Sequence, residues 1–391
     1  MNSFNFKSST RIIFGKDSFK DVGKYIKPHS SKILLHYEGE LIKKLGIYDT
    51  VINSLKENNI DFVELSGVVP NPRLSLVEKG IDICIDNNID FILAVGGGSV
   101  IDSSKAIALG TPYVGDVWNF FTGKDEPTSS LKVGVVLTIP GAGSEMSESS
   151  IITKEEDSTK AVCDTEFNIP EFAILDPQVC YSIPAKLMCC GIADILSHLM
   201  ERYFSPSKNV ELSDALIEGA MRTIINLGPK YLENPKDYNT CAEIMWTATV
   251  AHNGMIACGR VADWSSHRIE HEISALYDLN HGAGMAVIFP AWLKYVKKLN
   301  PEKIQRFSRN VFQCEDGIEA LENFFKSLGL ATTLKELNIP DENFDFMAKK
   351  ALGNRETMGN YVQLNAKDIT NILDVAMEGN IWKLKKILFI L

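Results

Sequence analysis

The sequence lacks the patterns typical of membrane-spanning, secreted and nucleic-acid-binding proteins. Its longest apolar stretches fall short of the roughly 20 residues needed to span a bilayer, and its start, MNSFNFKSSTRIIFG, lacks the charged-then-apolar pattern of a signal peptide. There is no long basic run, and the net charge is −10, which argues against nucleic acid or an anionic membrane as the main partner. We therefore expect a cytoplasmic protein that binds neither nucleic acid nor membrane.

The cysteines form no recognisable motif either. All 8 are dispersed without a CxxC pair, and such thiols in a chain without a signal peptide are usually reduced core residues. No Gly-x-Ser-x-Gly turn indicates a serine hydrolase. Apolar residues make up 45% and charged residues 23% of the 391 positions, which is typical of a globular protein with two ordinary domains.

What is present is an alternation of strand-like and helix-like segments over the first 180 or so residues. Apolar runs predict strands at 32–37, 61–65, 91–98, 133–140 and 172–177, and amphipathic stretches predict helices at 41–58 and 74–88. This order implies a Rossmann-like α/β domain with a parallel sheet. From 183 onward the segments are long and helically periodic. We expect an α/β domain over 1–182 and an all-helical domain over 183–391.

A glycine-rich loop follows the strand-like segment 91–95. Gly96, Gly97 and Gly98 allow the backbone to approach a diphosphate, and the helix that opens behind them favours an anion. Ser99 can add a hydroxyl donor, and Asp102 can accept from a ribose hydroxyl. The pattern departs from Gly-x-Gly-x-x-Gly, and a glycine triplet at a strand end is often only a turn.

A second loop, TIPGAGSEMSES, strengthens the prediction of a nucleotide site. It also follows a strand-like segment, and it offers Thr138 and Ser144 as polar contacts. Lys160 can neutralise a phosphate or bind a ribose edge. The alternatives are a solvated loop of turn-forming residues and an ordinary surface lysine.

Four residues can form a complete metal site. Asp194 and His198 are four apart in a helically periodic segment, so both side chains leave the same helix face. With His267 and His281 they offer three imidazoles and one carboxylate, which suit Fe²⁺ or Zn²⁺ better than Mg²⁺ or Ca²⁺. Five of the chain's 7 histidines fall within one quarter of its length. The alternative is that these are ordinary polar residues on helix surfaces.

His271 follows His267 by one helical turn and therefore faces the same side of its helix. It can relay a proton to or from a substrate oxygen, or line the nicotinamide pocket. A histidine that only supports the metal ligands through hydrogen bonds is an equally good interpretation.

Taken together, the motifs resemble the iron-containing alcohol dehydrogenase family, and within it the NAD(P)H-dependent butanol dehydrogenase and aldehyde reductase branch. The resemblance covers at least about 80% of the chain, as a count of ordered motifs. It runs through FILAVGGGSVID, LTIPGAGSEMS, FAILDP, GIADILSHLMERY and GRVADWSSHRIEHEISALYDLNHGAGMAVIFPAW.

The resemblance implies a nucleotide-binding domain, a helical metal-binding domain and an active-site cleft between them. By resemblance, the metal ligands are Asp194, His198, His267 and His281, and the pocket residue is His271. The implied cofactor contacts are Gly97, Gly98, Ser99, Asp102, Thr138, Ser144 and Lys160.

The expected reaction is the interconversion of primary, butanol-like alcohols and aldehydes by hydride transfer, with Fe²⁺ or alternatively Zn²⁺ polarising the oxygen. A polyol dehydrogenase of the glycerol or propanediol type on the same scaffold is an alternative. A nucleotide-binding protein with a structural metal is another.

The segment YEGELIKK bears on the choice between NADH and NADPH. An acidic residue near the end of the second strand accepts from the adenosine ribose and repels a 2′-phosphate, so Glu38 and Glu40 favour NADH. Gly39 leaves room for a phosphate and Lys43 and Lys44 can neutralise it, which argues the other way. The sequence leans towards NADH.

The opening segment NFKSSTRIIFG is strand-like and isolated before the first helix. Strand edges of this kind commonly pair with another edge, and the resemblance also implies a dimer. We therefore expect a homodimer.

Overall fold

The computed structural model describes residues 1–379 and gathers the chain into two compact units. The first unit consists of Lys7–Ile183 and Pro235–Asn253. The second consists of Met1–Phe6, Pro184–Asn234 and the chain from Gly254 onward. The two domains expected at 1–182 and 183–391 remain a prediction. The contacts within the chain group residues 1–6 with the second unit and residues 235–253 with the first.

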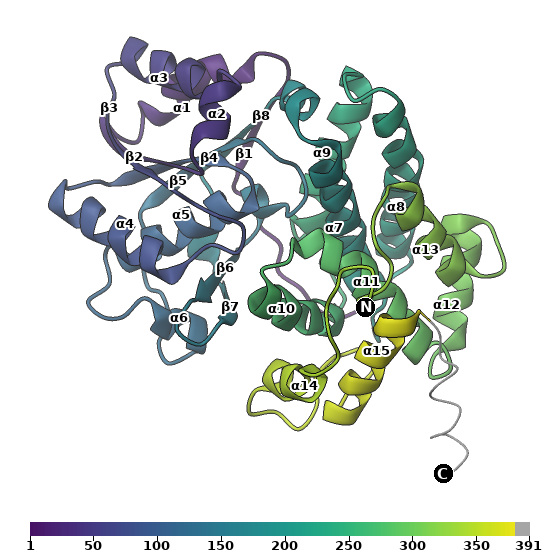
Figure 1. The fold of residues 1–391 in the computed structure, drawn as a ribbon. Helices are drawn as coiled ribbons and strands as arrows, with labels where there is room; N and C mark the ends of the chain where they lie inside the picture. The colour runs from purple at the N-terminus through teal and green to yellow at the C-terminus, as the bar shows by residue number, and fades with distance from the viewer. Residues whose placement is uncertain (380–391) are drawn as a thin grey trace. The chain divides into compact units, whose positions relative to one another are not determined.

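A six-stranded parallel sheet forms the centre of the first unit, in the order β1-β8-β5-β4-β2-β3. Its strands are β1 (Arg11–Phe14), β2 (Lys32–Tyr37), β3 (Asp61–Ser66), β4 (Phe91–Gly96), β5 (Lys132–Leu137) and β8 (Phe172–Leu175). Figure 1 shows α1 (Val22–Ile26), α2 (Glu40–Lys44) and α3 (Ile47–Glu57) on one face, and α4 (Leu74–Asp86) and α5 (Gly98–Gly110) on the other. The predicted α/β fold with a parallel sheet is confirmed.

The central strands are apolar because helices cover both faces of the sheet. Every residue of β4 is buried, as is β5 beyond Lys132. A parallel sheet covered on both sides needs a continuous apolar run rather than an alternating one. This is why the predicted strands lie within two residues of β2, β3, β4 and β8 at both ends, and within three residues of β5.

Two local features differ from the sequence-based prediction. The helix expected over 41–58 is divided into α2 and α3, because Gly46 adopts the left-handed conformation with φ 72° between them. An antiparallel hairpin of β6 (Ser149–Lys154) and β7 (Thr159–Asp164) was not predicted. Its strands carry lysines and threonines, and their apolar content is too low to indicate a strand.

The second unit is helical. Its longer helices are α7 (Ala185–Tyr203), α8 (Glu211–Glu233), α10 (Ser265–Tyr277), α11 (His281–Val296), α13 (Gly317–Ser327), α14 (Phe344–Leu352) and α15 (Ala366–Glu378), and α12 (Pro301–Phe307) is shorter. Helix α11 is buried almost throughout and packs against α7, α10 and α15. The remaining long helix, α9 (Tyr238–His252), belongs to the first unit.

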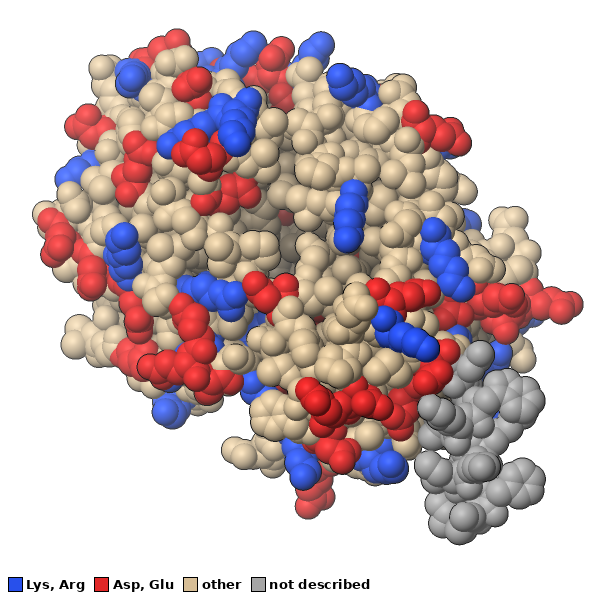
Figure 2. Space-filling view, in the orientation of Figure 1, with Lys and Arg blue, Asp and Glu red and all other residues tan. Residues whose placement is uncertain are grey.

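No helix among residues 1–379 combines the length and the apolar character needed to cross a membrane. On the face drawn in Figure 2, acidic and basic side chains are interspersed over the surface of the described chain.

Candidate functional site

The glycine-rich loop connects β4 to α5. Gly96 ends the strand, Gly98 begins the helix, and the Thr138 amide donates to the Gly96 carbonyl at 3.1 Å. A Cβ added to Gly98 would lie 2.7 Å from the Cβ of Ala142, which is too close for two carbon atoms. The glycine is required here because the second predicted loop packs directly against the first.

A buried lysine joins these two loops. Lys105, on α5, is fully buried and donates through Nζ to Ser144 Oγ and to the carbonyls of Ser144, Ser147 and Ser149 at 2.7 to 2.9 Å. Burial lowers the pKa of Lys105 to about 8, so the ammonium form still predominates at pH 7. This single charge fixes the backbone of the second loop against α5.

Asp102 and Ser144 also bond within the first unit. Ser144 Oγ donates to Asp102 Oδ1 at 2.5 Å, and the Ile151 amide donates to Asp102 Oδ2 at 3.1 Å. Burial raises the pKa of Asp102, and the charge of Lys105 opposes that rise. Both predicted cofactor contacts therefore also hold the loop in shape.

Helix α9 supports the second loop from its other side. Thr249 Oγ1 donates to Glu145 Oε1 at 2.6 Å, and both residues are buried. A Cβ added to Gly143, which has φ 65°, would lie 2.5 Å from the Cβ of His252. The loop conformation therefore depends on a helix that lies about 100 residues later in the chain.

The other predicted cofactor contacts lie at strand ends or in the hairpin. Lys160 is in β7 and donates to Asn71 Oδ1 at 3.1 Å. Glu38 and Gly39 follow β2, and Glu40 begins α2. Ser99 is partly exposed in the first turn of α5.

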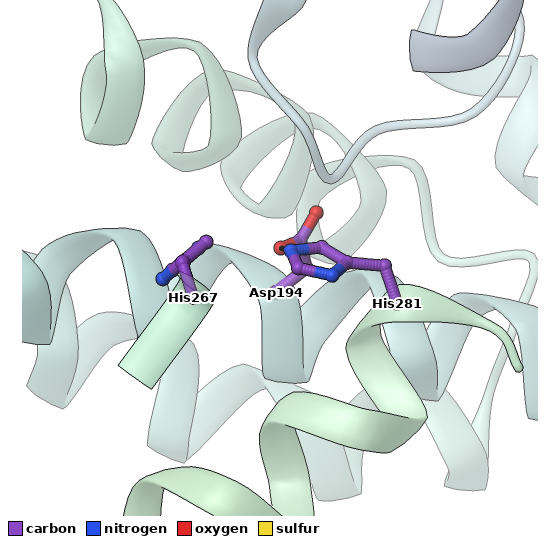
Figure 3. Close-up of side chains that lie close together, drawn as sticks. All are labelled: Asp194, His267 and His281. Atoms are coloured by element: carbon purple, nitrogen blue, oxygen red, sulfur yellow. Dashed lines mark ion pairs between the residues drawn. The ribbon is translucent and has the colours of Figure 1, made fainter. Parts of the chain in front are cut away.

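The predicted metal ligands converge from three helices of the second unit. Asp194 and His198 lie on α7, His267 on α10 and His281 in the first turn of α11. Ligand atoms of Asp194, His267 and His281 lie within 4.8 Å of one another, and Figure 3 shows the His281 ring extending towards the Asp194 carboxylate. His198 Nε2 lies 3.7 Å from Asp194 Oδ1, and the His198 and His267 rings are stacked with centroids 5.1 Å apart. The structure brings all four residues together.

The distances between the proposed ligand atoms fit a tetrahedrally coordinated ion. Two ligands each about 2.1 Å from such an ion lie about 3.4 Å apart. Asp194 Oδ1 is 3.6 Å from His281 Nε2 and 3.7 Å from His198 Nε2. His267 Nε2 is buried and has no hydrogen-bond partner among the described residues. A buried ring nitrogen of this kind is costly unless a ligand binds it, so the donor set suits a divalent cation.

Two buried carboxylates contact the opposite edges of the histidine rings. His267 donates through Nδ1 to Glu201 Oε1 at 2.7 Å, and His281 donates through Nδ1 to Glu270 Oε2. Burial alone would raise the pKa of Glu201, but the hydrogen bonds that it accepts from His267, Ser266 and the Trp264 amide outweigh burial, and the pKa lies below its usual value. Both bonds place the proton on Nδ1 and leave Nε2 as the coordinating atom.

His271 lies beside the cluster. Its ring centroid is 5.4 Å from that of His281 and 6.4 Å from that of His267, and the side chain is partly exposed. It could also form a group of possible ligands with Glu270 and His281. That group shares His281 with the first, and its Glu270 is already bonded to the His281 ring.

Sequence reasoning missed Lys105, Glu201 and Glu270. A signal was available for each, because Glu201 follows His198 by three residues and Glu270 follows His267 by three, which places them on the same helix faces. Lys105 follows Asp102 by three on α5 and therefore lies on the helix face of that predicted cofactor contact.

Comparison with known proteins covers almost the whole chain. The family model described as "Iron-containing alcohol dehydrogenase" matches residues 9–177, and "Fe-containing alcohol dehydrogenase family, C-terminal" matches residues 189–377. The probable NADH-dependent butanol dehydrogenase 1 of Bacillus subtilis is 38% identical over 96% of this chain and 100% of its own length. NADH-dependent butanol dehydrogenase A of Clostridium acetobutylicum is 38% identical over 95% of this chain and 99% of its own.

A solved structure gives the same result. The crystal structure of NADH-dependent butanol dehydrogenase A from Thermotoga maritima superposes with a TM-score of 0.94, at 38% identity, over 97% of this chain and 99% of that one. The chain therefore has the fold of that protein over nearly its whole length.

Proposed function

Because the chain belongs to the iron-containing alcohol dehydrogenase family, we propose that it interconverts primary, butanol-like alcohols and their aldehydes by hydride transfer with a nicotinamide cofactor. The observation that carries this proposal is the convergence of Asp194, His267 and His281 in the second unit, with His198 beside them. We also propose Fe²⁺ as the resident ion, with Zn²⁺ as the alternative, since three imidazoles and one carboxylate accept both.

The protein's own residues have separable tasks at this site. Asp194 and the three imidazoles hold the cation, which when bound supplies the positive charge that polarises a substrate carbonyl or acidifies an alcohol. His271, one helical turn from His267 and partly exposed, moves the proton to or from the substrate oxygen.

The nucleotide site lies in the first unit. The backbone at Gly97, Gly98 and Ser99 opens α5 and suits a diphosphate at the start of that helix. Thr138 and Lys160 contribute polar atoms from the neighbouring loop and hairpin. A bound nicotinamide supplies the hydride, while the loop held by Lys105 fixes where the nucleotide lies.

Absorbance at 340 nm tests the function directly. We expect the full-length protein, loaded with Fe²⁺ or Zn²⁺ without oxygen, to oxidise NADH when butanal is added and to stop when a chelator removes the metal. Parallel reactions with propane-1,3-diol and NAD⁺ test the polyol alternative. A protein that binds both metal and NADH but turns over neither substrate would contradict the proposed activity and leave a nucleotide-binding protein with a structural metal.

We further propose that NADH is the preferred cofactor. Glu40 is exposed at the start of α2 and pairs with Lys43 at 3.2 Å, so the positive charge of that lysine is already compensated. Glu38 is half-buried, and burial raises its pKa. Four relatives at 37 to 38% identity are described as NADH-dependent, whereas an aldehyde reductase of Escherichia coli at 32% is NADPH-dependent.

Removing both acidic side chains should shift this preference. In the double variant Glu38→Ser, Glu40→Ser, we expect the ratio of kcat/KM for NADPH over NADH to rise by about tenfold or more, because two charges about 4 Å apart near a surface interact by roughly 4 kcal/mol. Glu126→Ser, at an exposed loop position of the same unit, is the control. A parent enzyme that prefers NADPH tenfold, or a double variant with an unchanged ratio, would show that these carboxylates do not face the ribose.

A homodimer is also proposed. Strand β1 pairs with β8 alone among the strands of residues 1–379, which leaves its other edge available to a second copy. The segment before it exposes Phe4 and Phe6 at 56% and 42%. Light scattering should give about twice the chain mass of 43.4 kDa, and a monomer mass at micromolar concentration would contradict the proposal.

A further inference from the structure

Glu201 and Glu270 are almost completely buried, with 1% and 0% of their surface exposed. An ionised carboxylate in the interior is costly unless charge and hydrogen bonds compensate it. Neither residue belongs to the proposed ligand set, so the function proposed so far does not account for them. Each contacts a different histidine of that set.

Glu201 connects α7 to the beginning of α10. Its Oε2 accepts from the Trp264 amide at 2.6 Å, and its Oε1 accepts from the His267 amide at 3.2 Å and from His267 Nδ1 at 2.7 Å. Ser266 Oγ also donates to Oε1. A negative charge at a helix N-terminus is favourable, and it satisfies amides that have no partner within the helix. The helix that carries Asp194 and His198 is thereby tied to the helix that carries His267.

Glu270 connects α10 to α11. Its Oε1 accepts from Ser274 Oγ, and its Oε2 accepts from His281 Nδ1. Space for this carboxylate depends on Gly284, one turn beyond His281, because a Cβ there would lie 2.3 Å from Glu270 Oε1. A glycine in a helix interior costs roughly 1 kcal/mol relative to alanine, and the Glu270 carboxylate occupies the space that the missing side chain leaves.

We propose that Glu201 and Glu270 are positioning residues: each fixes one histidine with its proton on Nδ1 and Nε2 turned to the cation, and together they join α7, α10 and α11 into one preformed cage. The inference rests on the metal site proposed above. Because both carboxylates act through histidines, they set the affinity for the cation without touching it. Their charge also makes the imidazoles better donors to a cation.

The sharpest test is Glu270→Gln in the full-length protein. The amide oxygen of glutamine can still accept from His281, and its NH₂ group can donate to Ser274 Oγ, so shape is kept and the charge is lost. We expect the Kd for Zn²⁺ and for Co²⁺, measured by chelator competition, to rise by about 10 to 100-fold. We also expect the visible absorption of the Co²⁺ form to change, while the melting temperature of the metal-free protein stays near that of the parent. Glu201→Gln should weaken Zn²⁺ binding as well, but its NH₂ group would face the Trp264 amide, which is itself a donor, so the melting temperature of this variant should also fall.

A matched pair of glycine variants tests the cage without altering any polar group. Gly284→Ala should displace the Glu270 carboxylate and weaken Zn²⁺ binding by about tenfold or more, which is the range for lost outer contacts. Gly219→Ala, on α8 of the same unit, is the control, since the nearest atom to its added Cβ would be 3.9 Å away. Its Kd should equal that of the parent.

The outcomes separate this proposal from the proposed function. A parent protein that binds no divalent metal would overturn the metal site and with it the cage. A parent that binds metal tightly, with Kd values for Glu201→Gln, Glu270→Gln and Gly284→Ala all within twofold of it, would overturn the cage alone. Loss of all metal binding in His271→Ala would show that Glu270, His271 and His281 are the ligand set instead, and it would also overturn the positioning role.

Discussion

His267→Ala is expected to lose both its divalent metal and its catalysis. The variant removes one of the three proposed imidazole ligands, and a ring nitrogen of His267 lies within 4.8 Å of the ligand atoms of Asp194 and His281. A cation that polarises the substrate contributes several kcal/mol to the transition state, so kcat/KM for butanal should fall by about 10³-fold or more. Metal content by mass spectrometry and the NADH assay measure the two losses, and His281→Ala should reproduce them.

The control for this prediction is His271→Ala. Its ring lies beside the cluster rather than among the four proposed ligands, so it should keep its metal and lose rate through the proton transfer alone, a contribution of about 10²-fold or more. Circular dichroism should show that both variants remain folded. A metal-free His267→Ala protein with the activity of the parent would be decisive against the proposed site.

The second large effect is expected at Lys105, in the first unit. Lys105→Met leaves the carbonyls of Ser144, Ser147 and Ser149 without the donor they share. Each buried acceptor left without a donor costs about 1 to 3 kcal/mol, and removing one member of a buried charged network costs about 3 to 5 kcal/mol. We expect the melting temperature to fall by roughly 10 °C and the Kd for NADH to rise by about tenfold or more, because the second loop loses its attachment to α5.

Lys79→Met serves as the control for Lys105. This lysine is exposed on α4 of the same unit, and exposed substitutions usually change stability by less than about 0.5 kcal/mol. Differential scanning fluorimetry and a fluorescence titration with NADH give the two readouts. If Lys105→Met melts within 2 °C of the parent (about 1 kcal/mol or less) and binds NADH equally well, the lysine does not hold the loop.

The sequence predicted the parallel sheet well because its signal is local. Each central strand is a short apolar run that ends at turn-forming residues, as in FILAVGGG, and burial on both faces requires that composition. The proposed metal ligands were also accessible, since the spacing of Asp194 and His198 on one helix face follows from helix geometry alone. Local periodicity was sufficient in both cases.

The features that were missed depend on partners far away in the chain. Helical periodicity identifies α9 as a helix, but it does not reveal that this helix packs with the first unit. The spacing of Glu201 and Glu270 places them on the helix faces of His198 and His267, but it does not reveal that each bonds to a histidine of another helix. Lys105 likewise has its acceptors about 40 residues downstream, a distance at which residue spacing gives no guidance.

Because Pro235–Asn253 belongs to the first unit, the chain cannot be divided at a single bond into two fragments that each contain one whole unit. A cut at the bond between Ile183 and Pro184 does not yield two self-sufficient pieces. The amino-terminal fragment lacks α9, so Glu145 loses Thr249 as its donor and the loop at Gly143 loses its support. The carboxy-terminal fragment carries α9 without the surface that buries it. Truncation and domain-exchange experiments therefore need to move residues 235–253 together with residues 7–183, because the first unit is discontinuous in sequence.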